Sequence, residues 1–449
     1  MNYYEWFAAV AKKEPQQLFF VMDDEAWSYG EFLAQTDQLQ GLLQEKFPEN
    51  CRGGSYLLLG ESPVEQLAGF LALQALHIRP VLLHHGLAAA DIAAIMDRNQ
   101  LQGLITLVRE KGKGYEVSIR PTGYEKKIHA EADILGVLSS GSTGVPKVMY
   151  RTYESWAGFF PIQNPIFHVD GHTRLFLQGS LSFTGNLNAL LSVLYEGGSI
   201  ITCRKMRCRH WADWIERFQA NVLYLVPAKL QLLTAAVKGT LPSVGCLFTG
   251  SQLLSPRNIR DIQRLLPAAE ILLYYGASEL NYISYAICDD PDRDSRNLGR
   301  PFPGVKIRIQ DGLIFVDTAY HVSGARIPFS VKDTGFLNDK GELIFEGRRE
   351  AWVNKGGVKL SLTRLENKLR SIPGIQTAVL VACADSLRGS DFAAFVVKDE
   401  AVAGRVIRSR IRQALRPVEM PAKVLFLPQM PLNDRGKVAY PVLQEKLKA

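Results

Sequence analysis

The alternation of strand-like and helix-like segments is the feature that most limits the folds open to this chain of 449 residues. Near the N-terminus, the short apolar segments SYLLLG and RPVLLHHG are each followed by a longer segment with apolar residues at helical spacing. The same alternation resumes from Ile134 to about Ala286, with apolar segments such as RLFLQGS, GSIITC and CLFTG. Strands that alternate with helices predict parallel sheets covered on both faces.

The pattern changes twice after this region. From Leu298 the segments LGRPFPGVKIRIQDGLIFVDT and GELIFEGR alternate with Gly and Pro turns, which predicts a smaller antiparallel region. After Gly347 the sequence predicts a compact segment of helices and strands. We therefore expect an α/β protein with a large N-terminal domain at 1–346 and a small α/β C-terminal domain at 347–449. The polar stretch from Arg109 to Glu131 is expected to be a connection.

Composition excludes several classes of protein. No apolar run reaches the roughly 18 residues that a membrane-spanning helix needs, and the opening MNYYEWFAAVAKKEPQQ does not resemble a signal peptide. Six cysteines are few for this length, so a reducing cytoplasmic location is expected. Cys203, Cys208 and His210 lie close together in CRKMRCRHW, but no second cysteine pair accompanies them, which favours a basic surface turn over a zinc site.

The positive charge is concentrated in the last part of the chain. From Arg348 onward there are 19 Lys or Arg against 9 Asp or Glu, whereas the whole chain has 52 against 45. A basic C-terminal region indicates an anionic partner, such as a phosphorylated cofactor, an acidic protein or nucleic acid. By charge alone, a solvated basic surface explains the surplus equally well.

The stretch LSSGSTGVPKVMY, Leu138 to Tyr150, has the composition of an anion-binding loop. Its glycines allow backbone N–H groups to turn inward, its Ser and Thr hydroxyls add donors, and Lys147 adds positive charge. The spacing is not that of a Walker A loop, and the chain contains no G-x-S-x-G nucleophile elbow. By composition alone, a loop of this kind is more often a surface turn than a phosphate site.

Further motifs along the chain favour a phosphate site. Together with this loop, they resemble the adenylate-forming superfamily of acyl-CoA synthetases, peptide-synthetase adenylation domains and firefly luciferase. The phosphate loop of that family is matched by Ser139-Ser140-Gly141-Ser142-Thr143-Gly144-Val145-Pro146-Lys147. Further signatures follow in the family's order: YYGASE, with Tyr275, Gly276, Ser278 and Glu279; KDTGFLNDKGEL, with Asp333; GRREAWVNKGGVKLSLTRLE, from Gly347 to Glu366; and PLNDRGKVAY, with Lys437. The departures from the family pattern are Val148, Val331-Lys332 and Glu350.

The resemblance implies a role for each of these residues. The Ser139–Lys147 loop would hold the β- and γ-phosphates of ATP, with Thr143 as a side-chain donor, and Glu279 would hold Mg²⁺. Tyr275 would lie against the adenine with Gly250 and Ser251 near its other face, while Asp333 and Arg348 would bind the ribose. Lys437 would bridge the carboxylate and the α-phosphate. Glu350 would mark the hinge of a mobile C-terminal domain, and Gly356-Gly357 would let a pantetheine thiol approach.

The resemblance also implies a carboxylic acid as the substrate. An amino acid would need an acidic partner for its ammonium, and the phrase GSLSFTGNLNALL offers Ser182, Phe183 and Thr184 as pocket residues but no acid. An acid with an apolar or neutral body is therefore expected. The first hypothesis is an acyl-CoA synthetase that uses ATP, Mg²⁺ and coenzyme A. The second is an enzyme that loads an acyl carrier protein. The third is a non-catalytic protein that binds nucleic acid through its basic region; the presence of Lys437, Glu279 and Asp333 argues against it, so no nucleic-acid partner is expected.

Overall fold

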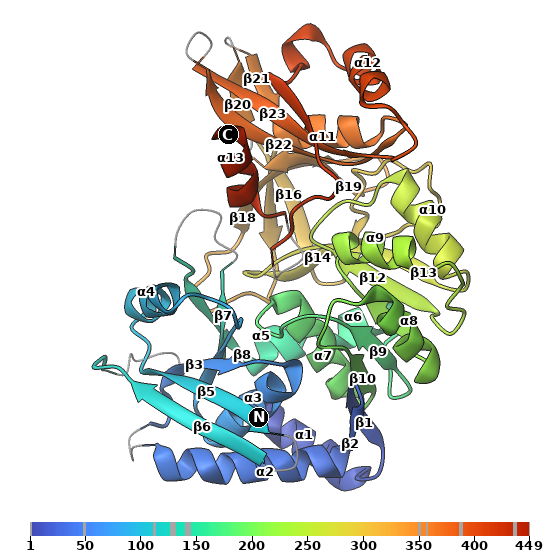
Figure 1. Cartoon of the computed structure of the whole chain (residues 1–449). Helices are drawn as coiled ribbons and strands as arrows, with labels where there is room; N and C mark the ends of the chain where they lie inside the picture. Colours follow the sequence, from blue (N-terminus) through green and yellow to red (C-terminus); the bar gives the residue numbers. More distant parts are fainter. Residues whose placement is uncertain are drawn as a thin grey trace.

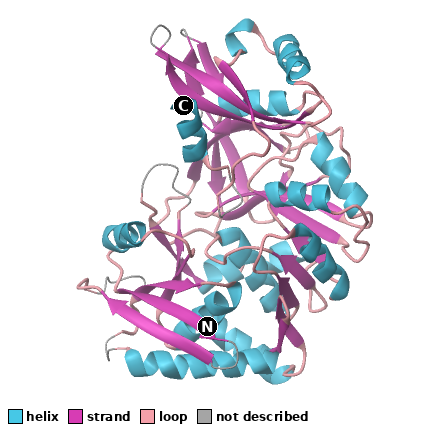
Figure 2. Cartoon of the chain, in the orientation of Figure 1, coloured by secondary structure: helices cyan, strands magenta, loops and turns pink. Residues whose placement is uncertain are grey.

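The computed structural model describes residues 2–47, 51–110, 114–125, 132–139, 145–348, 352–355, 358–385, 389–433 and 438–448. Within these ranges the chain forms four β-sheets with helices packed against them (Figure 1). Three sheets use residues before 349, and the fourth uses residues after 351. Figure 2 shows this last sheet, with its own helices, at one end of the molecule.

A six-stranded sheet has the order β6-β5-β3-β4-β7-β8. Its strands are β3 (Ser55–Gly60), β4 (Arg79–Leu83), β5 (Gly103–Glu110), β6 (Gly114–Pro121), β7 (Asp133–Leu138) and β8 (Val148–Thr152). The inner strands β5, β3, β4 and β7 are parallel, whereas β6 and β8 lie antiparallel at the two edges. The expectation of a plain connection after Arg109 is wrong, because β6 pairs with β5 from residue 114 to 121.

A nine-stranded sheet has the order β15-β14-β13-β12-β11-β9-β10-β1-β2. The six strands from β13 to β1 are parallel, and β14, β15 and β2 complete the edges in antiparallel pairings. Its strands are β1 (Leu18–Met22), β2 (Glu25–Ser28), β9 (Arg174–Leu177), β10 (Ser199–Thr202), β11 (Val222–Tyr224), β12 (Cys246–Gly250), β13 (Glu270–Ala277), β14 (Asn281–Ile287) and β15 (Arg300–Pro301).

Two smaller sheets follow in the chain. The third, in the order β16-β17-β18-β19, is antiparallel as the turn-rich sequence predicted. Its strands are β16 (Lys306–Gln310), β17 (Leu313–Asp317), β18 (Phe329–Leu337) and β19 (Leu343–Arg348). The fourth contains β20 (Trp352–Lys355), β21 (Val358–Ser361), β22 (Ile375–Asp385), β23 (Gly389–Lys398) and β24 (Lys423–Phe426).

Helices cover the sheets and connect their strands. They are α1 (Tyr3–Lys13), α2 (Tyr29–Lys46), α3 (Pro63–Ala75), α4 (Ala89–Asn99), α5 (Tyr153–Ala157), α6 (Phe160–Ile166), α7 (Thr184–Glu196), α8 (Cys208–Arg217), α9 (Pro227–Ala236), α10 (Pro256–Leu265), α11 (Leu362–Arg370), α12 (Gly404–Ala414) and α13 (Tyr440–Lys448), with a 3₁₀ turn at Pro417–Glu419. The predicted cap of α2 is confirmed, because Ser28 and Glu31 form a reciprocal capping box.

The helix α3 shows why the first two sheets form one body. All its residues from Pro63 to Gln74 are buried, so it has no solvent face, and such a helix belongs inside a large core. One continuous apolar core runs from Tyr3 to Leu343, while a separate core from Val353 to Leu415 lies behind the fourth sheet. The α/β fold with a large parallel part, an antiparallel sheet and a C-terminal α/β part is confirmed.

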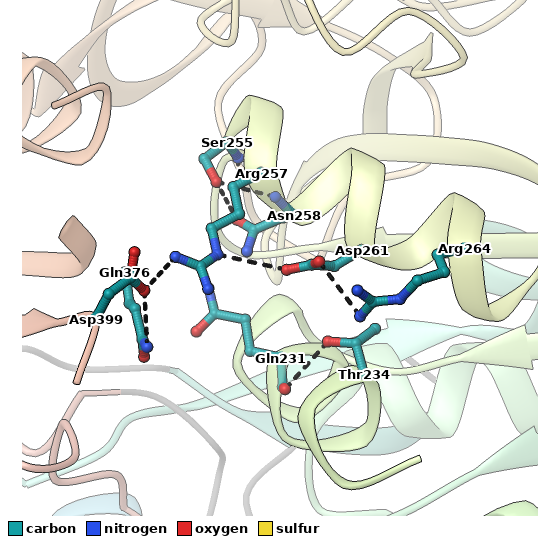
Figure 3. Close-up of polar contacts among 9 residues, drawn as sticks. All are labelled: Gln231, Thr234, Ser255, Arg257, Asn258, Asp261, Arg264, Gln376 and Asp399. Atoms are coloured by element: carbon teal, nitrogen blue, oxygen red, sulfur yellow. Dashed lines mark hydrogen bonds and ion pairs between the residues drawn. The ribbon is translucent and has the colours of Figure 1, made fainter. Parts of the chain in front are cut away.

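The C-terminal part touches the large part through α10. Arg257 of α10 contacts the carboxylate of Asp399, which also accepts a hydrogen bond of 3.1 Å from Nε2 of Gln376 (Figure 3). Within the same helix, Asp261 pairs with both Arg257 and Arg264. The predicted division between 346 and 347 falls inside β19 and remains a prediction.

Candidate active site

Predicted site residues lie at the carboxyl edge of the parallel part of the nine-stranded sheet. Gly250 ends β12, with Ser251 directly after it, and Tyr275 and Gly276 lie in the last residues of β13. The segment Ser182–Thr184 follows β9, which lies two strands from β12 in the same sheet. Since neighbouring parallel strands end at the same edge, these segments meet where ligands bind in α/β sheets.

Tyr275 and Asp333 join two motifs that are far apart in the sequence. The phenol of Tyr275 donates a hydrogen bond of 2.7 Å to Oδ2 of Asp333. Tyr275 comes from the nine-stranded sheet and Asp333 from β18 of the antiparallel sheet, where its backbone pairs with that of Arg348. Asp333 is 5% exposed, so its carboxylate is held in place rather than solvated. The predicted adenine and ribose residues are therefore neighbours.

Gly250 permits a close approach of backbone to ring at this edge. A Cβ atom at position 250 would lie 2.5 Å from Cε2 of Tyr274, closer than any side chain tolerates. The next residue, Ser251, has a φ of +71° and is exposed. The chain therefore turns sharply as it leaves β12 and presents Ser251 to solvent next to β13.

Ser278 and Glu279 lie in the turn between β13 and β14. The hydroxyls of Ser278 and Thr184 are 3.2 Å apart, which places the predicted acid segment against this turn. The carbonyl of Glu279 accepts a hydrogen bond of 2.9 Å from the N–H of Val322. The Glu279 side chain is half-buried, and a partly accessible carboxylate beside hydroxyl groups suits a divalent cation that also binds phosphate.

Arg151 holds this turn in place, and the sequence analysis did not single it out. It is 2% exposed, and its guanidinium donates to the carbonyls of Ser278, Ser155 and Tyr320 at 2.8, 3.0 and 3.3 Å. Burial lowers the pKa of Arg151 to about 10, against the opposing effects of Tyr3 and Glu279. A buried arginine that binds three carbonyls fixes backbone geometry, and only its position in β8, just after the Ser/Gly loop, hinted at this role.

The two ends of the Ser/Gly loop are closed by a pair of hydrogen bonds. The N–H of Ser139 donates to the carbonyl of Lys147 at 2.8 Å, and the N–H of Lys147 donates to Oγ of Ser139 at 2.9 Å. Asn99 of α4 supports the far end, because it binds both the Pro146 carbonyl and the Val148 N–H. The Lys147 side chain is exposed. The two described ends of the loop are thus held side by side.

The predicted acid segment is polar at its start. Oγ of Ser182 lies 2.9 Å from Oγ of Ser180, which in turn bonds to the amide of Gln66. The ring of Phe183 lies 5.6 Å from that of His84, at the end of β4 in the other large sheet. This segment therefore bridges the two sheets where both present their carboxyl ends.

Several predicted site residues lie outside the described residues. These are Ser140, Gly141, Ser142, Thr143, Gly144, Glu350, Gly356, Gly357 and Lys437. Arg348 is described as part of β19 through its backbone pairing alone. The roles predicted for these residues remain predictions.

A buried lysine near the acid segment was missed by the sequence analysis. Lys229, in the first turn of α9, is 4% exposed and donates a hydrogen bond of 2.7 Å to the carbonyl of Gln178. Burial lowers the pKa of Lys229 to about 8. In the sequence VPAKLQLL a lysine is an ordinary residue for an exposed helix position, so no pattern marked it.

A second polar cluster lies away from this edge. One ligand atom each from Asp23, Cys203 and His210 fall within 4.8 Å of one another, so the structure gathers two residues of CRKMRCRHW with a third from the N-terminal strands. Structural zinc sites have four ligands, and Arg204 and Arg207 beside this cluster oppose a cation. We assign it no function.

The arrangement of sheets and the site together define an adenylate-forming enzyme. The model of the family described as AMP-binding enzyme matches residues 7–314, and that of the AMP-binding enzyme C-terminal domain matches residues 364–437. The chain belongs to the AMP-binding enzyme family and is an ATP-dependent, AMP-forming ligase.

Similar proteins include ligases of more than one kind. "Uncharacterized acyl--CoA ligase YhfT" of Bacillus subtilis is 26% identical over 67% of this chain and 66% of its own length. "Putative long chain fatty acid-CoA ligase VraA" of Staphylococcus haemolyticus is 25% identical over 97% of this chain and 95% of its own. The vibriobactin-specific 2,3-dihydroxybenzoate-AMP ligase of Vibrio cholerae is 22% identical over 95% of this chain and 90% of its own.

The fold is shared with a solved structure over the whole chain. The ATP-bound RpMatB-BxBclM chimera B1 superposes with a TM-score of 0.84 at 21% identity, covering 100% of this chain and 99% of that one. Among the described residues, no helix is both long and apolar enough to cross a membrane.

Proposed function

We propose that this protein is an acid–thiol ligase that converts a carboxylic acid to an acyl-adenylate and then transfers the acyl group to coenzyme A. The observation that carries the nucleotide site is the hydrogen bond between Tyr275 and Asp333. It unites two family motifs from different sheets beside Gly250 and Ser251, at the edge where the acid segment also lies.

In the first half-reaction, a carboxylate oxygen of the acid attacks the α-phosphorus of ATP. The bond from that phosphorus to the bridging oxygen breaks, and pyrophosphate leaves with the electron pair. Negative charge rises on the phosphoryl oxygens, so fixed donors and cations lower the barrier. The Ser139–Lys147 loop would bind the departing phosphates through Ser139, Ser140, Gly141, Ser142, Thr143, Gly144 and Lys147.

The other predicted residues would bind the nucleotide and the acid. Tyr275 and Gly276 would line one face of the adenine with Gly250 and Ser251 opposite, and Asp333 and Arg348 would bind the ribose hydroxyls. Lys437 would bridge the carboxylate and the α-phosphate. Glu279, with Ser278 beside it, would hold Mg²⁺, which when bound offsets phosphate charge.

In the second half-reaction, the thiol sulfur of coenzyme A attacks the acyl carbon, and AMP leaves with the former carboxylate oxygen. We propose that the C-terminal domain, 347–449, turns about Glu350 between the two steps and brings Gly356-Gly357 against the pantetheine arm. The basic surplus of this domain suits a ligand with several phosphates. Cys203, Cys208, Cys246 and Cys288 form no disulfide, in keeping with a cytoplasmic location.

A second candidate acceptor is the phosphopantetheine arm of a carrier protein. The similarity to a 2,3-dihydroxybenzoate-AMP ligase favours it, because that enzyme is named for its acyl-adenylate and not for a coenzyme A product. A basic domain would also suit an acidic carrier. Nothing comparable supports a nucleic-acid partner.

Pyrophosphate release from ATP, measured with a panel of carboxylic acids with and without coenzyme A, tests the proposal. Turnover that requires an acid and rises with coenzyme A is the expected result. A single stoichiometric burst unaffected by coenzyme A would instead identify the carrier-dependent enzyme. Lys437→Ala is expected to abolish acyl-adenylate formation while ATP binding stays measurable, and undiminished adenylation by this variant would refute the assignment.

A further inference from the structure

Lys229 is a buried positive charge for which the described part of the chain supplies no negative partner. Its ammonium has three donor hydrogens, and the structure gives it one acceptor, the Gln178 carbonyl at 2.7 Å. Among the described residues no carboxylate lies within ion-pair distance of Lys229, and burial is the only cause that shifts its pKa. Lysines are almost never fully buried unless they are paired. Such a costly arrangement indicates that something other than the fold completes it.

A glycine lets this ammonium and a second donor pack directly against the backbone. Gly179 has a φ of +125°, and a Cβ there would lie 2.9 Å from Nζ of Lys229 and 2.9 Å from Nδ2 of Asn186. Two donor groups from different helices thus converge above Gly179. Asn186 is 7% exposed and also binds the Ser180 carbonyl at 2.9 Å. Oε1 of Gln178 is buried and has no hydrogen-bond partner.

These groups adjoin the predicted acid segment. Gln178 and Gly179 directly precede Ser180–Thr184, and Ser180 and Ser182 are joined through their hydroxyls at 2.9 Å. At the other end of this segment, Thr184 lies 3.2 Å from Ser278 of the nucleotide motif. The segment therefore has the nucleotide motif at one end and the buried ammonium at the other. Because β9 and β11 are parallel neighbours, Lys229 lies at the same sheet edge as the reaction.

We propose that Lys229 binds a second carboxylate of the substrate, so that the enzyme activates one end of a dicarboxylic acid while the other end pairs with this lysine. The inference rests on the proposed function and refines it. The substrate would carry a second negative charge at its far end, instead of the apolar or neutral body expected from the sequence. A monocarboxylic acid would leave the ammonium unpaired, whereas a dicarboxylic acid of matching length supplies both the charge and the missing acceptors. Asn186 would donate to the same carboxylate.

The test compares chain-matched acids, such as butyrate with succinate and hexanoate with adipate, in the wild type and in Lys229→Met. Methionine has nearly the same volume without the charge. The expected wild-type result is at least one dicarboxylic acid preferred over its monocarboxylic match by about 100-fold in kcat/KM, as for a desolvated charge pair, mainly through KM. Lys229→Met should lose this preference and gain on the monocarboxylic acid. Lys238→Met, at an exposed lysine just beyond α9, should behave as the wild type.

Two further measurements separate this role from a structural one. The wild-type preference for the dicarboxylic acid should fall as pH rises through about 8, where Lys229 loses its proton, and Lys229→Met should show no such fall. If Lys229 merely anchors the Gln178 carbonyl, the variant will lose stability and will slow both acids alike, which would overturn the proposal. A wild-type preference for an oxo acid such as 4-oxopentanoate over every dicarboxylic acid would also overturn it.

Failure of the proposed function has a different signature. If no acid releases pyrophosphate, calorimetric titration of the wild type and Lys229→Met with the same dicarboxylic acids still decides the matter. Binding by the wild type that the variant loses about 100-fold supports the inference without any catalysis. Equal binding, or none by the wild type, refutes it.

Discussion

The Tyr275 phenol donates to the Asp333 carboxylate at 2.7 Å, and the two residues come from different sheets and lie far apart in the chain. The bond orients the carboxylate that we assign to the ribose. A hydrogen bond to a charged group contributes about 1.5 to 3 kcal/mol. We therefore expect the relative placement of the second and third sheets to affect nucleotide binding.

Replacing Tyr275 by Phe should raise the KM for ATP about ten-fold, equivalent to about 1.4 kcal/mol, with a smaller change in kcat. The ring remains to pack against adenine, so the loss reports the orientation of Asp333 alone. Steady-state pyrophosphate release at varied ATP measures it. Tyr285→Phe, in the neighbouring strand β14, is the matched control. An unchanged KM for ATP in Tyr275→Phe would show that this hydrogen bond does not serve the nucleotide.

Replacing Arg151 by Met should reduce the free energy of unfolding by about 3 kcal/mol, because three carbonyls lose a charged donor in a buried place. The turn that carries Ser278 and Glu279 should loosen, so the Mg²⁺ concentration needed for half-maximal activity should rise. Thermal unfolding and Mg²⁺ titration of activity check the two effects. Arg174→Met, at an exposed arginine, should change neither. Full stability in Arg151→Met would contradict this account.

The C-terminal part should become less stable in acid because of Glu419. Burial raises the pKa of Glu419, but hydrogen bonds from Arg416 and Lys368 outweigh it and lower the pKa from 4.5 to about 2. Since the folded-state value lies below the unfolded one, this stabilisation is complete above pH 4.5 and is lost as pH falls through about 2. Glu419→Gln should cost about 1 to 2 kcal/mol at pH 6, after allowance for solvent screening of the exposed partners.

Thermal unfolding of the wild type and Glu419→Gln between pH 6 and pH 2.5 tests this pH dependence. The difference in Tm should shrink steadily below pH 4.5, because the carboxylate of the unfolded wild type takes up a proton there while that of the folded protein stays ionised. A difference that stays constant over this range would mean that packing, not charge, is lost in the variant.

The contact between Arg257 and Asp399 should restrain the C-terminal part (Figure 3). Both side chains are partly exposed, at 46% and 28%, so the pair should contribute no more than about 1 kcal/mol. Arg257→Ala should therefore raise hydrogen exchange several-fold in the backbone around Asp399, with little change in Tm. Arg264→Ala, which loses a contact to Asp261 in the same helix, is the control. Equal exchange in the two variants would show that this contact does not hold the two parts together.

Local patterns predicted much of this fold. The cap at Ser28, the alternation of strands and helices and the antiparallel region after Leu298 are each signalled within a few neighbouring residues. The strand β6 was missed because it is an edge strand among Lys- and Gly-rich residues; Tyr115, Val117 and Ile119 alternate with polar residues along it, but Val117 is its one buried residue. An exposed edge strand and a polar connection look alike in composition.

At the candidate site, some residues could likewise be predicted from the sequence and others could not. Tyr275 and Asp333 could be proposed because they belong to motifs with fixed spacing, and the structure brings them together. Arg151 and Lys229 were not found, since their roles depend on contacts with residues 127 and 51 positions away. A basic residue that folds inward has the same sequence signature as one that faces water, so its burial is visible only in three dimensions.

The pairing of β1 with β10 has a consequence for synthesis of the protein. Phe20 of β1 lies opposite Ile200 of β10. The pairing of these two strands therefore cannot form until about 180 residues after β1 have been made. At ribosomal rates of about 5 to 20 residues per second, β10 is made roughly 10 to 40 s after the apolar strand β1. The six-stranded sheet, whose last strand ends at Thr152, is made earlier. Until β10 is made, β1 can pair only with β2, so the nascent chain keeps one edge of an apolar strand unpaired, and we expect a chaperone on the ribosome to bind there.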